Sequence, residues 1–78
     1  MVIKVVGSGC SNCKKLLELT KEAVQSLHVN AEVLYVTDLM EIAKTGIMRT
    51  PGLIIDGKIV SYGRVPQLDE IKTFIQNA

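Results

Sequence analysis

The sequence predicts an α/β protein with the element order β-α-β-α-β-β-α and a mixed four-stranded sheet flanked by helices. A long amphipathic pattern separates two β-branched segments, so these two strands should pair in parallel through a helical crossover. An Asp-Gly pair between two later apolar runs indicates an antiparallel hairpin. The chain has 78 residues, 47% of them hydrophobic and 22% charged, which suits one small domain spanning residues 1–78.

The N-terminal half begins with a strand and continues with a helix. Four of the five residues in Val2–Val6 are apolar and β-branched, a pattern typical of a strand covered on both faces. Gly7-Ser8-Gly9 ends this strand. Over Ser11–Leu27 the apolar residues recur at helical spacing, and the arc that they share includes Cys13.

A second strand and a short helix are expected next. Ala31–Val36 is rich in strand-forming residues. Thr37 or Asp38 should cap the short helix, with Glu41 three residues after Asp38 as in a capping box, and Gly46 should end it. The residues expected to be buried here are Leu39, Ile42 and Ala43 on the helix, and Met40 and Met48 as fillers in or near the core.

The last three elements follow the Thr50-Pro51 pair. Leu53–Ile55 and Lys58–Val60 flank Asp56-Gly57, the strongest short-range signal for a tight hairpin. Pro66 is expected to open a final helix, whose apolar residues are Leu68, Ile71 and Ile75.

Composition and charge exclude several classes of function. The formal net charge is +1, which offers no electrostatic basis for binding nucleic acid. The apolar runs are far shorter than the roughly 20 residues of a membrane-spanning helix. The N-terminal residues do not resemble a secretory leader, so we expect a cytoplasmic protein. Two cysteines are too few for a secreted disulfide scaffold, and closely spaced cysteines in the cytoplasm are more often catalytic or metal-binding.

The motif Cys10-Ser11-Asn12-Cys13 lies where the first strand passes into the first helix. Residues three apart on a helix are close enough for a disulfide to form after a small tightening of the turn. The helix N-terminus should stabilise a thiolate at Cys10, while Cys13 should be more buried. Lys14 follows at once and would be favourable beside a thiolate, or would simply be a solvated lysine. A purely structural staple is disfavoured, because so short a loop removes little entropy from the unfolded chain.

Two other functions use the same pair of cysteines. Small metal chaperones place CxxC between a first strand and a first helix, and thiolates suit Cu(I) or Zn. Those domains usually carry Met two residues before the first cysteine, where this chain has Ser8, and they end in a strand. A non-catalytic redox switch would use the same thiol chemistry as an oxidoreductase. Arg49 could steer an anionic partner or could be an ordinary surface residue.

The motif at Cys10, the Thr50-Pro51 pair and the hairpin followed by a helix resemble the thioredoxin and glutaredoxin superfamily. The segments Arg49–Lys58 and Gly63–Pro66 are similar to its small prokaryotic branch, the glutaredoxin-like thioredoxins. The resemblance covers nearly the whole chain and implies a thioredoxin fold.

The resemblance also implies a function, a thiol–disulfide oxidoreductase that acts on protein disulfides. Cys10 would be the nucleophile and Cys13 the resolving cysteine. Pro51 would be cis and pack against the disulfide, and the backbone of Thr50 would bind the substrate. A thioredoxin-reductase-type donor would return the electrons, no bound cofactor or metal would be needed, and the protein would act as a monomer.

The motif departs from the usual family patterns in ways that bear on the partner. Gly9 replaces the common Trp before the motif. Ser11-Asn12 replaces the common Gly-Pro inside it, so Ser11 and Asn12 would modulate the site. Val2–Val6 lacks the buried acid of typical thioredoxins. The hairpin is followed by Ser61–Val65 in place of the Gly-Gly and Asp of glutathione-binding glutaredoxins. The sequence therefore predicts that glutathione is a poor reductant of this protein.

Overall fold

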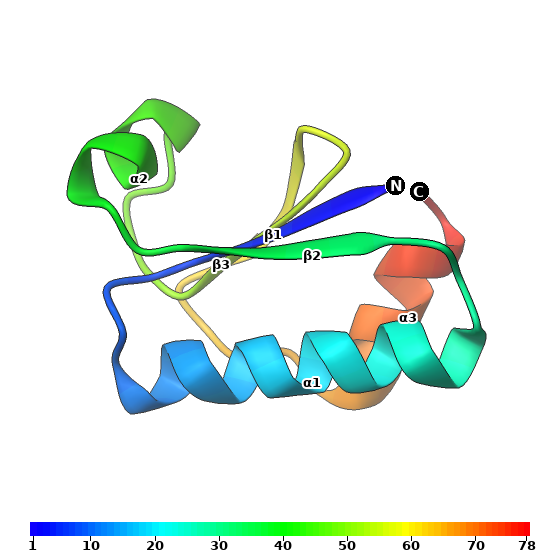
Figure 1. Cartoon of the computed structure of the whole chain (residues 1–78). Coiled ribbons are helices and arrows are strands. Elements are labelled where there is room, and N and C mark those ends of the chain that lie inside the picture. The colour runs from blue at the N-terminus through cyan, green and yellow to red at the C-terminus, as the bar shows by residue number, and fades with distance from the viewer.

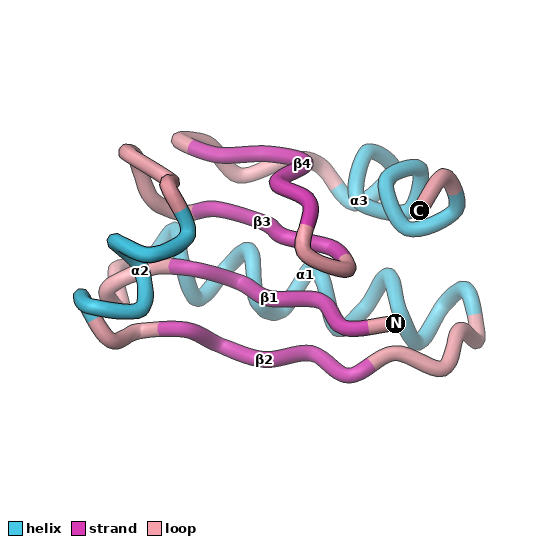
Figure 2. The backbone as a smooth tube through the Cα atoms, turned by 90° about the horizontal axis from the view of Figure 1, so that it is seen from above, coloured by secondary structure: helices cyan, strands magenta, loops and turns pink.

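The four strands lie in the order β2-β1-β3-β4 in the computed structural model, which describes residues 1–78. Strand β1 (Val2–Val6) is central and pairs in parallel with β2 (Glu32–Val36). On its other side β1 pairs antiparallel with β3 (Gly52–Ile55), which in turn pairs antiparallel with β4 (Lys58–Tyr62). Figure 2 shows the four strands side by side. The predicted mixed four-stranded sheet is confirmed.

Three helices pack against this sheet, two on one face and one on the other (Figure 1). Helices α1 (Ser11–Leu27) and α3 (Leu68–Gln76) run along the same face. The short α2 (Leu39–Thr45) lies over the opposite face, near the end where β1 passes into α1. The element order β-α-β-α-β-β-α is the predicted one. No helix is both long and apolar enough to cross a membrane.

The apolar core is divided between the two faces in unequal parts. The larger cluster lies between the sheet and the helices α1 and α3, and consists of Ile3, Val5, Leu16, Ala23, Leu53, Ile55, Ile71 and Ile75. The smaller cluster lies under α2 and consists of Val6, Ile42, Ile47 and Ile54. Burial of apolar surface is the main favourable contribution to folding, so α1 and α3 contribute most of it.

The prediction that β1 is covered on both faces is correct only in part. Ile3 and Val5 are fully buried under α1 and α3, whereas Lys4 is exposed and Val2 is 37% exposed. Helix α2 has only seven residues and covers only the end of its face near Val6. The rest of that face has no helix against it, because the chain supplies only one helix on that side.

The sequence predicts burial for five apolar residues in and after α2, and the prediction is wrong for four of them. Ile42 is buried, but Leu39, Met40 and Met48 are 73%, 70% and 93% exposed, and Ala43 is exposed as well. A helix of two turns contacts the sheet through one side of a single turn, so only Ile42 reaches the core. Leu39, Met40 and Ala43 lie on the other sides of the helix and face solvent, and the next buried apolar residue is Ile47, after the helix.

The predicted cap of α2 at Asp38 is confirmed, but the predicted roles of Glu41 and Pro66 are wrong. The Asp38 carboxylate accepts a hydrogen bond from the Met40 N–H at 3.3 Å, as expected of a cap. Its predicted capping-box partner, Glu41, instead pairs with Lys44 at 3.5 Å. Helix α3 begins at Leu68 with Gln67 as its cap, so Pro66 precedes the helix and does not open it.

The β3–β4 turn is the predicted Asp-Gly hairpin. Both turn residues adopt left-handed conformations, with φ of 48° at Asp56 and 82° at Gly57. This combination defines the tight turn whose twist matches that of the strands.

Candidate active site

Cys10 and Cys13 form a disulfide at the junction between β1 and α1. Their Cα atoms are 5.1 Å apart, which lies within the usual range for a disulfide. The first turn of α1 brings the two sulfurs together without any long-range rearrangement. The sequence prediction that this pair can close locally is therefore confirmed.

Cys10 is the N-cap residue of α1, so its sulfur lies at the positive end of the helix dipole. The Sγ atom accepts a hydrogen bond from the backbone N–H of Cys13 at 3.3 Å. The first turn of α1 contains no acidic residue. A negative charge on Cys10 would thus have a donor and a favourable field already in place.

The two sulfur-bearing residues differ sharply in exposure. Cys10 is exposed, whereas Cys13 is fully buried at 0%. A disulfide-bearing partner can therefore approach Cys10 but not Cys13. The Cys13 sulfur can still reach the Cys10 sulfur from the buried side, because the two residues lie on the same helical turn.

Gly7 makes room for Cys13, a role that the sequence did not reveal. A Cβ atom added at Gly7 would lie 2.8 Å from the Cys13 Cβ and would also collide with its sulfur. Real Cβ atoms essentially never approach a neighbour so closely. The only signal in the sequence is a glycine directly after the first strand, which also has the simpler role of ending that strand.

The loop before β3 lies next to the disulfide. Gly52 pairs with Val6 in antiparallel register, so Pro51 lies opposite Gly7, the residue in contact with Cys13. The Thr50–Pro51 peptide is cis, as the resemblance implies. The carbonyl oxygen of Pro51, which is buried, accepts a hydrogen bond from the Gly63 N–H at 2.9 Å.

Thr50 presents unused hydrogen-bonding groups beside the disulfide. The residue is exposed, and neither its N–H nor its carbonyl oxygen has a backbone partner. An extended peptide lying along this loop would find a free donor and a free acceptor. Such an arrangement is suited to strand-like recognition of a polypeptide.

The other candidate residues also lie at this end of the molecule. Ser11, Asn12 and Lys14 are exposed in the first turn of α1, and none of them is part of an ion pair. No group of three or more His, Cys, Asp or Glu side chains is placed to hold a metal ion.

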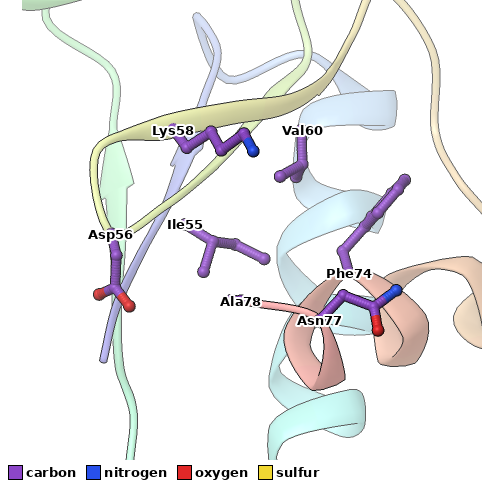
Figure 3. A pocket seen from close by; sticks show the side chains of 7 residues that line it. All are labelled: Ile55, Asp56, Lys58, Val60, Phe74, Asn77 and Ala78. Carbon is purple, nitrogen blue, oxygen red and sulfur yellow. The ribbon is translucent and has the colours of Figure 1, made fainter.

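A separate cavity of about 300 Å³ lies at the other end of the sheet (Figure 3). It is formed by the β3–β4 hairpin and the last helix, far along the sheet from the disulfide. Its lining consists of Ile55, Asp56, Lys58, Val60, Phe74, Asn77 and Ala78. None of the candidate residues contributes to this cavity.

Comparisons with known proteins agree with this geometry. Residues 1–76 match the family model described as "Thioredoxin domain". A protein named thioredoxin from Methanocaldococcus jannaschii is 42% identical over 72 residues, covering 92% of this chain and 83% of the relative. Another thioredoxin, from Methanothermobacter thermautotrophicus, is 36% identical over 75 residues, covering 96% and 97% of the two chains. The chain therefore belongs to the thioredoxin family and is a thiol–disulfide oxidoreductase with a redox-active Cys10–Cys13 pair.

Proposed function

We propose that this protein reduces disulfides in cytoplasmic protein substrates, with Cys10 as the nucleophile and Cys13 as the resolving cysteine. The observation that carries the proposal is the contrast between the two sulfurs. Cys10 is exposed and caps a helix, and Cys13 is fully buried three residues further on. The thiolate is the reactive form of cysteine, and the helix N-terminus favours it at Cys10.

The reaction proceeds through two exchanges of sulfur–sulfur bonds. The Cys10 thiolate attacks one sulfur of the substrate disulfide, forming a mixed disulfide and releasing the other substrate sulfur as a thiolate. Cys13 then loses its proton and attacks the Cys10 sulfur, which breaks the mixed disulfide. The protein retains the Cys10–Cys13 disulfide after giving up two electrons, and the substrate leaves with two thiols, which take up one proton from Cys13 and one from solvent.

The residues around the sulfurs have supporting roles in this proposal. Thr50 binds the substrate backbone with its free N–H and carbonyl groups, and Pro51 packs beside the sulfurs and shapes the groove. Ser11 and Asn12 modulate the site from the helix turn that joins the cysteines. Lys14 adds positive charge near the thiolate.

The oxidised protein must be reduced again by a second protein. We propose an electron donor of the thioredoxin-reductase type, because the glutathione signature of glutaredoxins is absent after the hairpin. The protein would act as a monomeric single domain without a bound cofactor.

Substitution of each cysteine tests the division of labour. Cys10→Ser should abolish reduction of an insulin disulfide, and Cys13→Ser should accumulate a mixed disulfide through Cys10 that mass spectrometry detects. In the reduced wild type, iodoacetamide should modify Cys10 much faster than Cys13. Faster modification of Cys13 would overturn the assignment, and one turnover without further cycles would favour the redox switch.

The choice of electron donor is tested by coupled turnover. We expect faster turnover with a thioredoxin reductase and NADPH than with glutathione, glutathione reductase and NADPH. Efficient turnover driven by glutathione would contradict the proposed donor while leaving the cysteine roles intact.

A further inference from the structure

The surface around the disulfide carries an unusual concentration of exposed apolar side chains. The four large hydrophobic residues with the greatest exposure, 60–93%, are Leu39, Met40, Met48 and Tyr62. Leu39 and Met40 begin α2, which is separated by two residues from β2, whose last residue pairs with Val6. Tyr62 pairs with Gly52, which also pairs with Val6. Strands β2 and β4 end, and α2 begins, at the side of the sheet where β1 leads into the disulfide.

Arg49 lies within this surface, and its position is defined by packing. Its Cβ and Cδ atoms lie 3.3 and 3.5 Å from the point that a Cβ of Gly63 would occupy. The side-chain stem therefore rests on the backbone of Gly63, whose N–H donates to the Pro51 carbonyl. The stem is therefore held against this backbone, while the residue as a whole is exposed and its guanidinium can reach solvent.

The guanidinium of Arg49 has no partner within the chain. The two ion pairs of the protein are Lys44–Glu41 and Arg64–Glu70. Asp38 also lies at this end, but one of its carboxylate oxygens accepts from the Met40 N–H. The chain thus presents an anchored, unpaired cation one residue from the free backbone groups of Thr50.

Other charges at this end have the same sign. Lys14 and Lys15 follow the disulfide on α1, form no ion pair, and have no acid in the first turn. A segment approaching Cys10 therefore meets unpaired cations from α1 and from the residue before Thr50. Like charges on the segment would be repelled, and carboxylates would be attracted.

We infer that Arg49 is a specificity-determining residue that binds a carboxylate of the protein substrate beside its disulfide. The guanidinium is planar and suits a carboxylate with two parallel hydrogen bonds. The preferred partner is an extended segment with Asp or Glu next to its cysteine and large apolar residues that contact Met48 and Tyr62. This inference rests on the proposed function, because it concerns the substrate of the same site.

The test compares two disulfide peptides that differ only in Glu or Gln next to one cysteine. We expect the wild type to favour the Glu peptide about fivefold in kcat/KM, through a lower KM, since exposed ion pairs are weak. Arg49→Gln should reduce this preference to about one. Arg49→Lys should retain part of it. Higher salt should weaken the preference, because the pair is exposed to solvent.

Lys58→Gln is the matched control, because it removes the same charge at the opposite end of the sheet. The preference should survive in this variant. An unchanged preference in Arg49→Gln, or an equal loss in Lys58→Gln, would overturn the inference. Equal turnover of both peptides by the wild type would overturn the inference alone. No turnover of either peptide would overturn the proposed function with it.

Oxidised glutathione provides the last arm, because it also carries carboxylates. We expect Arg49→Gln to reduce its slow turnover by a smaller factor than that of the Glu peptide, because the glutathione signature of glutaredoxins is absent after the hairpin. A larger loss with glutathione than with the Glu peptide would assign Arg49 to glutathione and overturn a protein carboxylate as its partner.

Discussion

The two ends of the sheet differ in how many of their backbone groups are hydrogen-bonded and in how much apolar surface they expose. At the end with the hairpin turn, the Asp56 carboxylate accepts from the Val2 N–H at 2.8 Å, and the Asp56 N–H donates to the Val2 carbonyl at 2.8 Å. At the end with the disulfide, the Thr50 backbone is unpaired, and Met48 is 93% exposed. Unused hydrogen bonds and exposed apolar surface contribute nothing to folding. The disulfide end therefore offers groups that a partner can bind, whereas the hydrogen bonds of the hairpin end hold the sheet together.

The largest effect in this comparison is expected from Gly7→Ala at the disulfide end. The new methyl group would collide with Cys13, so we expect a loss of about 1–3 kcal/mol in the free energy of unfolding. Disulfide exchange should slow as well, because the sulfur is displaced. Chemical denaturation and insulin reduction measure the two effects.

Ser8→Ala is the matched control for Gly7→Ala, since Ser8 is the exposed neighbour. It should change neither quantity appreciably. A Gly7→Ala protein as stable and active as the wild type would show that the close approach of Gly7 to Cys13 is unimportant.

Asp56→Ala should affect stability at the hairpin end and leave the chemistry alone. The variant loses the hydrogen bond to Val2 and places alanine at a φ of 48°, so we expect a loss of about 1–2 kcal/mol. Asp56→Asn retains an oxygen acceptor and tolerates this conformation, so it should lose less. Denaturation curves measure the stability. Slower insulin reduction by Asp56→Ala would contradict the expectation that the hairpin end does not affect the chemistry.

Glu70 gives a pH-dependent contribution to stability near the start of α3. Hydrogen bonds from Arg64 and from the Gln67 N–H lower the pKa of the Glu70 carboxyl below its ordinary value. A carboxyl with a lowered folded-state pKa stabilises the fold above its unfolded pKa, and this contribution fades as the pH falls through the folded pKa. Glu70→Gln should therefore flatten the stability curve below about pH 4.5. Thermal unfolding at several pH values measures this, and an unchanged slope would contradict it.

Met48→Ser should have the smallest effect on stability. The side chain is 93% exposed, so its loss should change the free energy of unfolding by less than about 0.5 kcal/mol. Its contribution should instead be visible as a higher KM for apolar disulfide peptides. A large loss of stability would show that the exposed apolar surface supports the fold after all.

Much of the architecture is predictable because it depends on local chemistry. The 3.6-residue pattern of Ser11–Leu27 and the Asp56-Gly57 turn each specify their element through their own residues. The placement of Cys10 before that helix, with Cys13 on its apolar arc, fixes which sulfur is exposed. The cysteine pair and its closure into a disulfide could therefore be predicted from one short segment.

The packing of α2 and the surroundings of the disulfide depend on contacts between distant segments. Leu39 and Met48 are apolar, and only the position of α2 on the sheet decides that they face solvent. Gly7 matters because Cys13 packs against it, and Arg49 because its stem rests on Gly63. Gly7 and Cys13 are 6 positions apart in the sequence, and Arg49 and Gly63 are 14 apart. The local sequence pattern does not specify how the chain turns between them. The elements and the reactive cysteine pair can thus be inferred from local patterns. The surface that a partner meets depends on tertiary packing, because burial and close approach are properties of the assembled sheet and helices.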